Sequence, residues 1–195
     1  TCASLDVGGV KAATMGESAG GVERNEILAH VLAKDSQQPQ DEPLIASNIN
    51  EQLQHMGLST WSISLQRRLR DAVGRLQPKT LLEVGASIGH RTAWLMDLFE
   101  REQRTLQALT LVEQGGKFGV ILKRLLQRYD ALDWSTVVVG DPERLAAEHQ
   151  AWKLASATAT ELSQTPFEPA YDVIVVDGPS SCLLYTSPSP RDVSS

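Results

Sequence analysis

Cysteine is scarce in this chain: among 195 residues there are only Cys2 and Cys182, which lie near opposite ends. No C-x-x-C pair or Cys/His spacing exists, so the sequence offers neither a zinc site nor a disulfide framework. No apolar run approaches the roughly 20 residues of a membrane span. The first residues also lack the basic and then apolar pattern of a signal peptide. We therefore expect a cytoplasmic protein without a membrane partner.

Basic residues are fewer than acidic ones: 18 Lys and Arg against 24 Asp and Glu give a formal net charge of −6. That balance disfavours nucleic acid as a partner. The one basic cluster, QRRLRDAVGR at residues 66–75, has the spacing of a solvated helix face. The chain length and an apolar content of 42% suit one domain with a full hydrophobic core.

Both ends lack any regular pattern. Residues 1–21 are small and Gly-rich, and we expect a disordered leader there, with Met15 as a start. Residues 182–195, CLLYTSPSPRDVSS, hold too much Ser and Pro for a helix or a central strand. They resemble adapter or linker read-through, so we expect a disordered, non-native tail from residue 182, the point at which the native chain would have continued differently. A natural disordered tail is the alternative.

Between the ends, the apolar period changes in a regular way. Residues 22–77 have the pattern of helices, the last of them capped by Ser59 or Thr60. From residue 78 to 181, four short apolar strands alternate with three helical segments: TLLEVG, LQALTLVE, STVVVG and YDVIVVDG are the strands. Strands that are apolar throughout are covered by helices on both faces, and their alternation with helices indicates a parallel sheet. The sequence predicts an α/β, Rossmann-like, doubly wound sheet preceded by N-terminal helices.

The segment after the first strand, EVGASIGH, fits two kinds of site. In a G-x-S-x-G nucleophile elbow, Ser87 would be the attacking hydroxyl of a hydrolase. That fold orders its triad as Ser, acid, His, and the only histidine after His90 is His149. The acid at the end of the fourth strand, Asp177, follows His149 and is out of order. An elbow on the first strand of the sheet is also unexpected.

A cofactor loop explains more of these residues. Gly85 and Gly89 permit a tight turn, and with Ala86 and Ser87 they let the backbone approach a ligand at a helix N-terminus. Glu83 stands two residues before the first glycine, where it would repel a pyrophosphate but suit an ammonium group. The G-x-G-x-x-G fingerprint of dinucleotide folds is absent. The pattern favours a cofactor that carries an amino acid.

Acidic residues close the other strands. Glu113, followed by Gln114, ends the second strand, where a carboxylate can accept hydrogen bonds from both hydroxyls of a ribose. Asp141 follows the third strand and can meet an adenine amino group, cap the next helix, or do both. Asp177 ends the fourth strand. Open α/β sheets bind ligands at these carboxyl ends.

The four strand ends, taken in order, resemble the motifs of class I S-adenosylmethionine (SAM)-dependent methyltransferases over residues 59–181. The matching segments are EVGASIG, LVEQ, VVGDPERL and DVIVVDG. The helix-rich start and LLEVGASIGHRTAWL are most similar to the small-molecule O-methyltransferases of the catechol and caffeoyl-CoA type. Those enzymes commonly read E-x-G-x-x-x-G-Y-S, and here the last two positions are His90 and Arg91. The resemblance implies a sheet whose first four strands have the order 3-2-1-4, with the later strands missing from this chain.

The resemblance also implies a reaction. SAM would be the cofactor, with Glu83 at the methionine amino group, residues 85–89 at the methionine end, Glu113 at the ribose and Asp141 near the adenine. The acceptor would be an oxygen of a small molecule. Asp177 would be the catalytic residue and would bind a divalent cation such as Mg²⁺, unless it only caps a loop. The resemblance leaves room for a homodimer.

Three alternatives stay open at this point. They are a hydrolase that uses Ser87, a dinucleotide-binding oxidoreductase, and a cofactor-binding fragment without activity. The fragment is included because a sheet that stops at its fourth strand would expose an unpaired edge.

Overall fold

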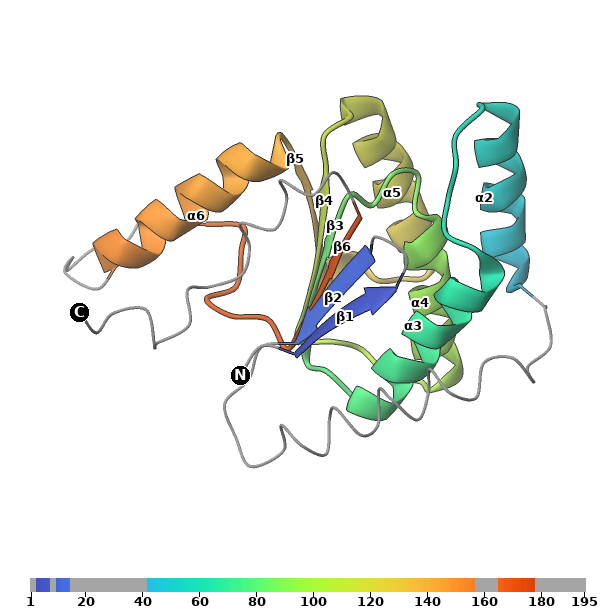
Figure 1. Ribbon diagram of the computed structural model, residues 1–195, viewed down its shortest axis with the longest axis horizontal. Coiled ribbons are helices and arrows are strands. Elements are labelled where there is room, and N and C mark those ends of the chain that lie inside the picture. Colours follow the sequence, from blue (N-terminus) through green and yellow to red (C-terminus); the bar gives the residue numbers. More distant parts are fainter. Residues whose placement is uncertain (1–2, 8–9, 15–41, 157–164, 178–195) are drawn as a thin grey trace.

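The computed structural model describes residues 3–7, 10–14, 42–156 and 165–177 (Figure 1). Within these ranges, two helices precede an alternation of strands and helices, as the sequence predicts. The helices are α2 (Leu44–His55), α3 (Ile63–Leu76), α4 (His90–Arg101), α5 (Gly116–Arg128) and α6 (Pro142–Ser156), with a 3-10 turn η2 at Leu132–Trp134. The strands are β1 (Ala3–Val7), β2 (Val10–Thr14), β3 (Thr80–Val84), β4 (Ala108–Glu113), β5 (Ser135–Val139) and β6 (Val173–Val176).

The six strands form one sheet in the order β1-β2-β6-β3-β4-β5. The strands β6, β3, β4 and β5 are parallel, so the four predicted strands stand in the order 3-2-1-4 across the sheet. The predicted Rossmann-like arrangement is therefore confirmed. Glu83 of β3 is in register with Leu111 of β4 and with Val175 of β6, which brings the carboxyl ends of three strands to one edge.

The hairpin β1–β2 differs from the expected disordered leader. β2 pairs with β6 in antiparallel fashion, so the edge of the fourth strand, which we expected to be unpaired, is covered. The physical reason is that such an edge presents a row of free backbone groups, which an extended segment of the same chain can satisfy. Gly8-Gly9 between the two strands is a known hairpin dipeptide, a signal that the sequence analysis missed. The rest of the leader, residues 22–41 and the tail from residue 182 lie outside the described residues.

Helices cover both faces of the sheet. Figure 1 shows α6 on one side and α2, α3, α4 and α5 on the other. Side chains of β3 alternate between the two layers: Leu81 packs in the cluster with Leu95 and Phe99 of α4, whereas Leu82 packs with Leu145 of α6. Both faces of the strand are buried, which explains why its sequence is apolar nearly throughout.

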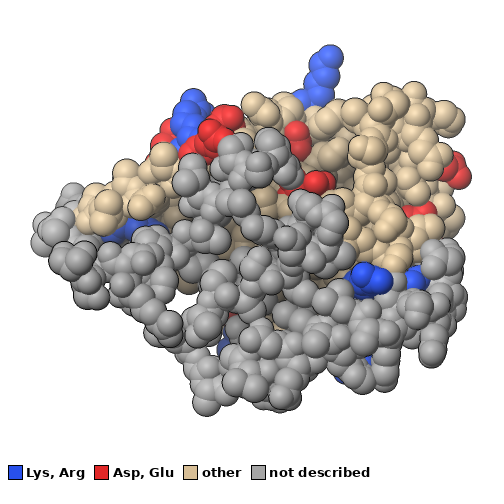
Figure 2. Space-filling model, viewed as in Figure 1, with Lys and Arg blue, Asp and Glu red and all other residues tan. Residues whose placement is uncertain are grey.

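The described helices are all too short or too polar to cross a membrane. On the face shown in Figure 2, Lys and Arg side chains stand among Asp and Glu side chains, and the part of it that the structure describes has charges of both signs.

Candidate functional site

The turn from β3 into α4 lies at the carboxyl edge of the sheet and is tightly enclosed by protein. Gly85 has φ +78°, and a Cβ there would overlap the carbonyl oxygen of Asp177. Gly89 has φ +91°, and a Cβ there would overlap the side chain of Leu125. Both positions need glycine for its backbone conformation and for its lack of a side chain. The predicted tight turn is confirmed, but the atoms nearest these glycines belong to the protein itself.

The backbone amides of this turn are bound within the molecule. The N–H groups of Gly85 and Ala86 donate to the carbonyl of Val112, at 2.9 and 3.2 Å. The N–H of Ser87 donates to Oε2 of Glu113 at 2.7 Å. The structure therefore ties this turn to β4, and these three amides are not presented to a phosphate.

Glu83 is completely buried, and α4 occupies both of its carboxylate oxygens. Arg91 donates from Nε to Oε1 at 3.0 Å, and the Thr92 hydroxyl donates to Oε2 at 2.8 Å. Burial raises the pKa of Glu83, and the charge of Arg91 and these hydrogen bonds oppose the rise. The structure thus differs from the expected contact between Glu83 and an ammonium group, because the first turn of α4 lies over the carboxylate.

Arg91 joins three separate parts of the site. Besides Glu83, it contacts Asp177 at the end of β6, with 2.9 Å from Nη1 to Oδ2, and the carbonyl of Gly85, with 2.7 Å from Nη2. The guanidinium also lies over the Trp61 ring, 4.3 Å from its centroid. Arg91 is only 4% exposed, whereas the Asp177 side chain is 42% exposed. Sequence analysis noted Arg91 only as a departure from the family motif and did not predict this role.

The charge around Arg91 is not balanced. Two carboxylates, Glu83 and Asp177, contact one guanidinium, so the three groups carry one excess negative charge when both acids are ionised. The more exposed partner, Asp177, is the one that a ligand could reach. The negative charge that this edge presents to a ligand is therefore that of Asp177, since Glu83 is fully buried and burial raises its pKa.

Glu113 is held in place by the backbone on both sides. Its Oε2 accepts from the N–H of Ser87 at 2.7 Å, and its Oε1 accepts from the N–H of Gly115 at 2.9 Å. A carboxylate has about four acceptor positions, so each oxygen keeps one for another donor. Gln114, the next residue, is exposed.

Asp141 caps α6, as predicted. Its Oδ1 accepts from the N–H of Arg144 at 2.9 Å, and its side chain is exposed. The end of β5 also meets the end of β4, because the N–H of Gly140 donates to the carbonyl of Glu113 at 3.1 Å. Asp141 therefore follows a strand end that adjoins Glu113, and its contact with an adenine stays a prediction.

His90 is buried beneath the preceding helices. Its Nε2 lies 2.7 Å from Oε1 of Glu42, while its Nδ1 lies 2.8 Å from the Thr60 hydroxyl and 3.1 Å from the Gln66 amide nitrogen. A carboxylate only accepts, so Nε2 carries the proton and Nδ1 accepts from Thr60 and Gln66. Burial lowers the pKa of His90, which favours this neutral form.

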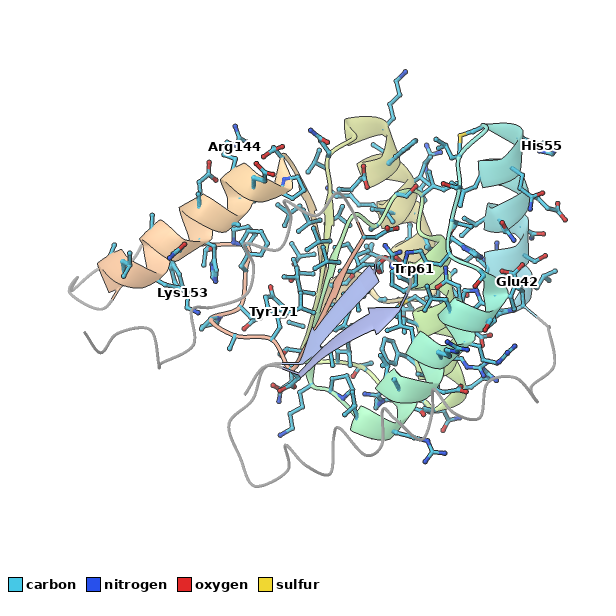
Figure 3. The ribbon with its side chains drawn as sticks, in the orientation of Figure 1. Glu42, His55, Trp61, Arg144, Lys153 and Tyr171 are labelled. Atoms are coloured by element: carbon cyan, nitrogen blue, oxygen red, sulfur yellow. The ribbon has the colours of Figure 1, made fainter. Side chains whose placement is uncertain are left out.

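The helical segment before the sheet thus reaches the site twice. Glu42 and Trp61, labelled in Figure 3, come from the chain before α2 and from the chain between α2 and α3. Glu42 binds His90, and Trp61 covers Arg91. Thr60, predicted as a helix cap, instead makes a hydrogen bond with His90. The cap of α3 is Ser62, whose hydroxyl accepts from the N–H of Leu65.

The hydrolase alternative needs a histidine beside Ser87, and neither His90 nor His149 is placed there. Ser87 does have the positive φ, +54°, that a strained elbow can adopt. Both ring nitrogens of His90 are bound elsewhere, and His149 stacks on Trp152 and packs near Phe167, with ring centroids 5.5 and 5.4 Å apart. Neither histidine is paired with Ser87.

The expected divalent cation does not fit the residues that surround Asp177. In the described ranges, no group of three or more His, Cys, Asp or Glu side chains could hold a metal ion. Asp177 is already paired with the guanidinium of Arg91, and Glu83 behind it is completely buried. The sequence-based assignment of Asp177 as a metal ligand is thus not supported.

Comparison with known proteins gives matches among solved structures. One is the O-methyltransferase TomG from Streptomyces achromogenes, involved in tomaymycin synthesis and solved with SAM: 16% identity, TM-score 0.46, covering 65% of this chain and 55% of that one. Another is the methyltransferase PaMTH1 from Podospora anserina, bound to S-adenosylhomocysteine (SAH): 12% identity, TM-score 0.45, covering 68% and 56%. A methyltransferase from Geobacter sulfurreducens has 18% identity and a TM-score of 0.46, covering 65% and 61%.

The chain thus spans a little over half the length of these matches. No protein-family model and no curated protein matches it.

Proposed function

We propose that this chain carries the SAM-binding part of a methyltransferase that acts on an oxygen of a small-molecule acceptor. The observation that carries the proposal is Glu113, a carboxylate at the end of the second strand that two backbone amides hold in place. Its remaining acceptor positions suit the two adjacent hydroxyls of a ribose. The chain supplies the fixed geometry, so little ordering is needed when the nucleoside binds.

The charge of the site favours a cationic cofactor over a dinucleotide. The Asp177 side chain is 42% exposed, and Glu113, at the end of β4 and hydrogen-bonded to the turn, adds a further carboxylate at this edge of the sheet. An ammonium or sulfonium group gains from such surroundings, whereas a pyrophosphate is repelled. The amides of Gly85, Ala86 and Ser87, which would bind a phosphate, already have partners.

When bound, SAM would supply an activated methyl group on its sulfonium, and a nucleophilic oxygen of the acceptor would take that group. The role of this chain is to position the cofactor. Glu113 would bind the ribose, Asp177 would accept from the amino group, and Glu83 would act indirectly by fixing Arg91. Trp61 and the helices before β3 exclude water from the Arg91 side of the turn. Gly85, Ala86, Ser87 and Gly89 would shape the methionine end, with Gln114 and Asp141 toward the adenosine.

Cytoplasmic location, a homodimeric assembly and the absence of nucleic-acid and membrane partners belong to the same proposal and stay predictions. The acceptor and the complete activity are proposals as well, since the chain spans a little over half the length of its structural matches.

Calorimetry with SAH and NADH tests the proposal. We expect SAH to bind with a stoichiometry of one, NADH to give no heat, and a fluorophosphonate probe to leave Ser87 unlabelled. Glu148→Gln is a suitable control for charge, since this residue lies on α6 in an exposed ion pair. Heat with NADH and none with SAH would favour an oxidoreductase, and labelling of Ser87 would favour a hydrolase.

A further inference from the structure

Arg91 uses all three nitrogens of its guanidinium to connect the end of β3, the turn and the end of β6. The partners are Oε1 of Glu83 at 3.0 Å, the carbonyl of Gly85 at 2.7 Å and Oδ2 of Asp177 at 2.9 Å. A planar guanidinium with fixed N–H directions fits such a set of acceptors, and it keeps its charge at every working pH. The position of Asp177 is therefore set by a permanent cation.

This arrangement competes directly with a metal ion. A divalent cation on the other oxygen of Asp177 would lie beside the guanidinium, which repels a double charge about twice as strongly as the single charge of an ammonium group. In the wild type Glu83 cannot serve as a second ligand, because it is fully buried behind Arg91 and Thr92. The Trp61 ring lies over the guanidinium, 4.3 Å from its centroid, and Arg91 is only 4% exposed, so the cation is enclosed where it contacts Asp177.

We propose that Arg91 is a built-in cation that takes the place of a divalent metal ion beside Asp177, so that this site binds SAM and acts without a metal. Arg91 is thereby a positioning residue for Asp177. The inference rests on the proposed function for the identity of the cofactor, but its claim about metals concerns only the residues of this chain.

The first experiment measures Mn²⁺ binding to the wild-type chain by electron paramagnetic resonance, with no other ligand present. We expect no stoichiometric Mn²⁺ site. We also expect the Kd for SAH to change by less than about twofold when EDTA or MgCl₂ is added. A stoichiometric Mn²⁺ site that is lost in Asp177→Asn would overturn the inference. So would SAH binding that requires Mg²⁺.

The second experiment removes the cation. Arg91→Met leaves both Glu83 and Asp177 without the cation that they share, and we expect a Mn²⁺ site between the two carboxylates to appear, then to disappear in the double variant with Asp177→Asn. Arg91→Lys retains a positive charge and should bind no Mn²⁺. The matched control is Arg101→Met, which frees Asp97 from a surface ion pair of 2.6 Å and should also bind none.

Each result has a separate meaning. Absence of a Mn²⁺ site from both the wild type and a folded Arg91→Met would show that Arg91 is not what excludes the metal, and it would overturn the inference. If Arg91→Met does not fold, as judged by circular dichroism, a stoichiometric Mn²⁺ site in the wild type or in Arg91→Lys would still overturn the inference. Failure of SAH to bind with or without Mg²⁺ would refute the proposed function instead, because the Mn²⁺ measurement does not depend on SAH.

Discussion

The sharpest test of the proposed cofactor site is the substitution Glu113→Gln. In the structure, the two oxygens of Glu113 accept from Ser87 at 2.7 Å and from Gly115 at 2.9 Å. Glutamine is nearly isosteric, but one oxygen becomes an NH₂ group. Whichever way the amide turns, this donor faces either a backbone N–H or a position needed by a ribose hydroxyl. The substitution therefore changes the hydrogen bonding and the charge without changing the volume.

The expected loss follows from the two hydroxyl contacts. A hydrogen bond to a charged group contributes about 1.5–3 kcal/mol, against about 1 kcal/mol for a neutral pair. Weakening two such contacts should cost about 2–3 kcal/mol, which is about a 30- to 150-fold increase in the Kd for SAH.

Calorimetry at constant pH measures that Kd, with urea unfolding to show that the variant is folded. Glu148→Gln removes one negative charge from an exposed position on α6 and should leave the Kd unchanged. A folded Glu113→Gln whose Kd lies within about threefold of the wild type would refute the assignment of Glu113 to the ribose.

Three further predictions concern stability and use urea unfolding. Glu83→Gln keeps an oxygen that can accept from Arg91 but removes the buried negative charge beside it, and it should lower the unfolding free energy by about 3–5 kcal/mol. Asp97→Asn, at a surface i,i+4 pair, should lower it by no more than about 0.5 kcal/mol. Equal losses would show that burial of the pair is unimportant. Burial lowers the pKa of His90, so folding favours the neutral ring. This preference contributes fully to the unfolding free energy at pH values above the unfolded pKa of about 6.5, and the contribution is lost as the pH falls below that value. The unfolding free energy of wild type should therefore drop more between pH 7.5 and 5.5 than that of His90→Gln, and parallel profiles would contradict this. Gly85→Ala should lower the unfolding free energy by at least about 3 kcal/mol, because φ is positive at this residue and the new Cβ would overlap Asp177. Gly74→Ala, inside α3, would make only ordinary contacts and should raise the unfolding free energy by about 0.5–1 kcal/mol. A mild effect at Gly85 would mean that the turn can relax.

Local patterns in the sequence were sufficient for the framework of the fold. Strands that are covered on both faces must be apolar throughout, and segments such as TLLEV and ALTLVE show this directly. Their alternation with helices indicates a parallel sheet, and the order 3-2-1-4, which the resemblance to the methyltransferases implied, is the one observed. The helix cap at Asp141 was also predictable, because a cap and its partner lie only three residues apart.

The hairpin β1–β2 was not predicted. Residues 1–21 have no strong period of their own, and the pairing of β2 with β6 joins residues far apart in the chain. Its stabilisation comes from the open edge of β6, a property of the assembled sheet that no local window of sequence contains.

The sequence by itself determined which residues stand at the carboxyl ends of the strands, because strand limits and glycine turns are local features. Only the tertiary structure decided what those residues contact. Arg91 meets Asp177 across 86 positions of sequence, and His90 meets Glu42 across 48. These pairs exist because folding buries Arg91 and His90, and a buried charged or polar group must find a partner wherever the chain brings one near. For that reason Glu83, which the sequence offers as a ligand contact, became instead the buried support of Arg91.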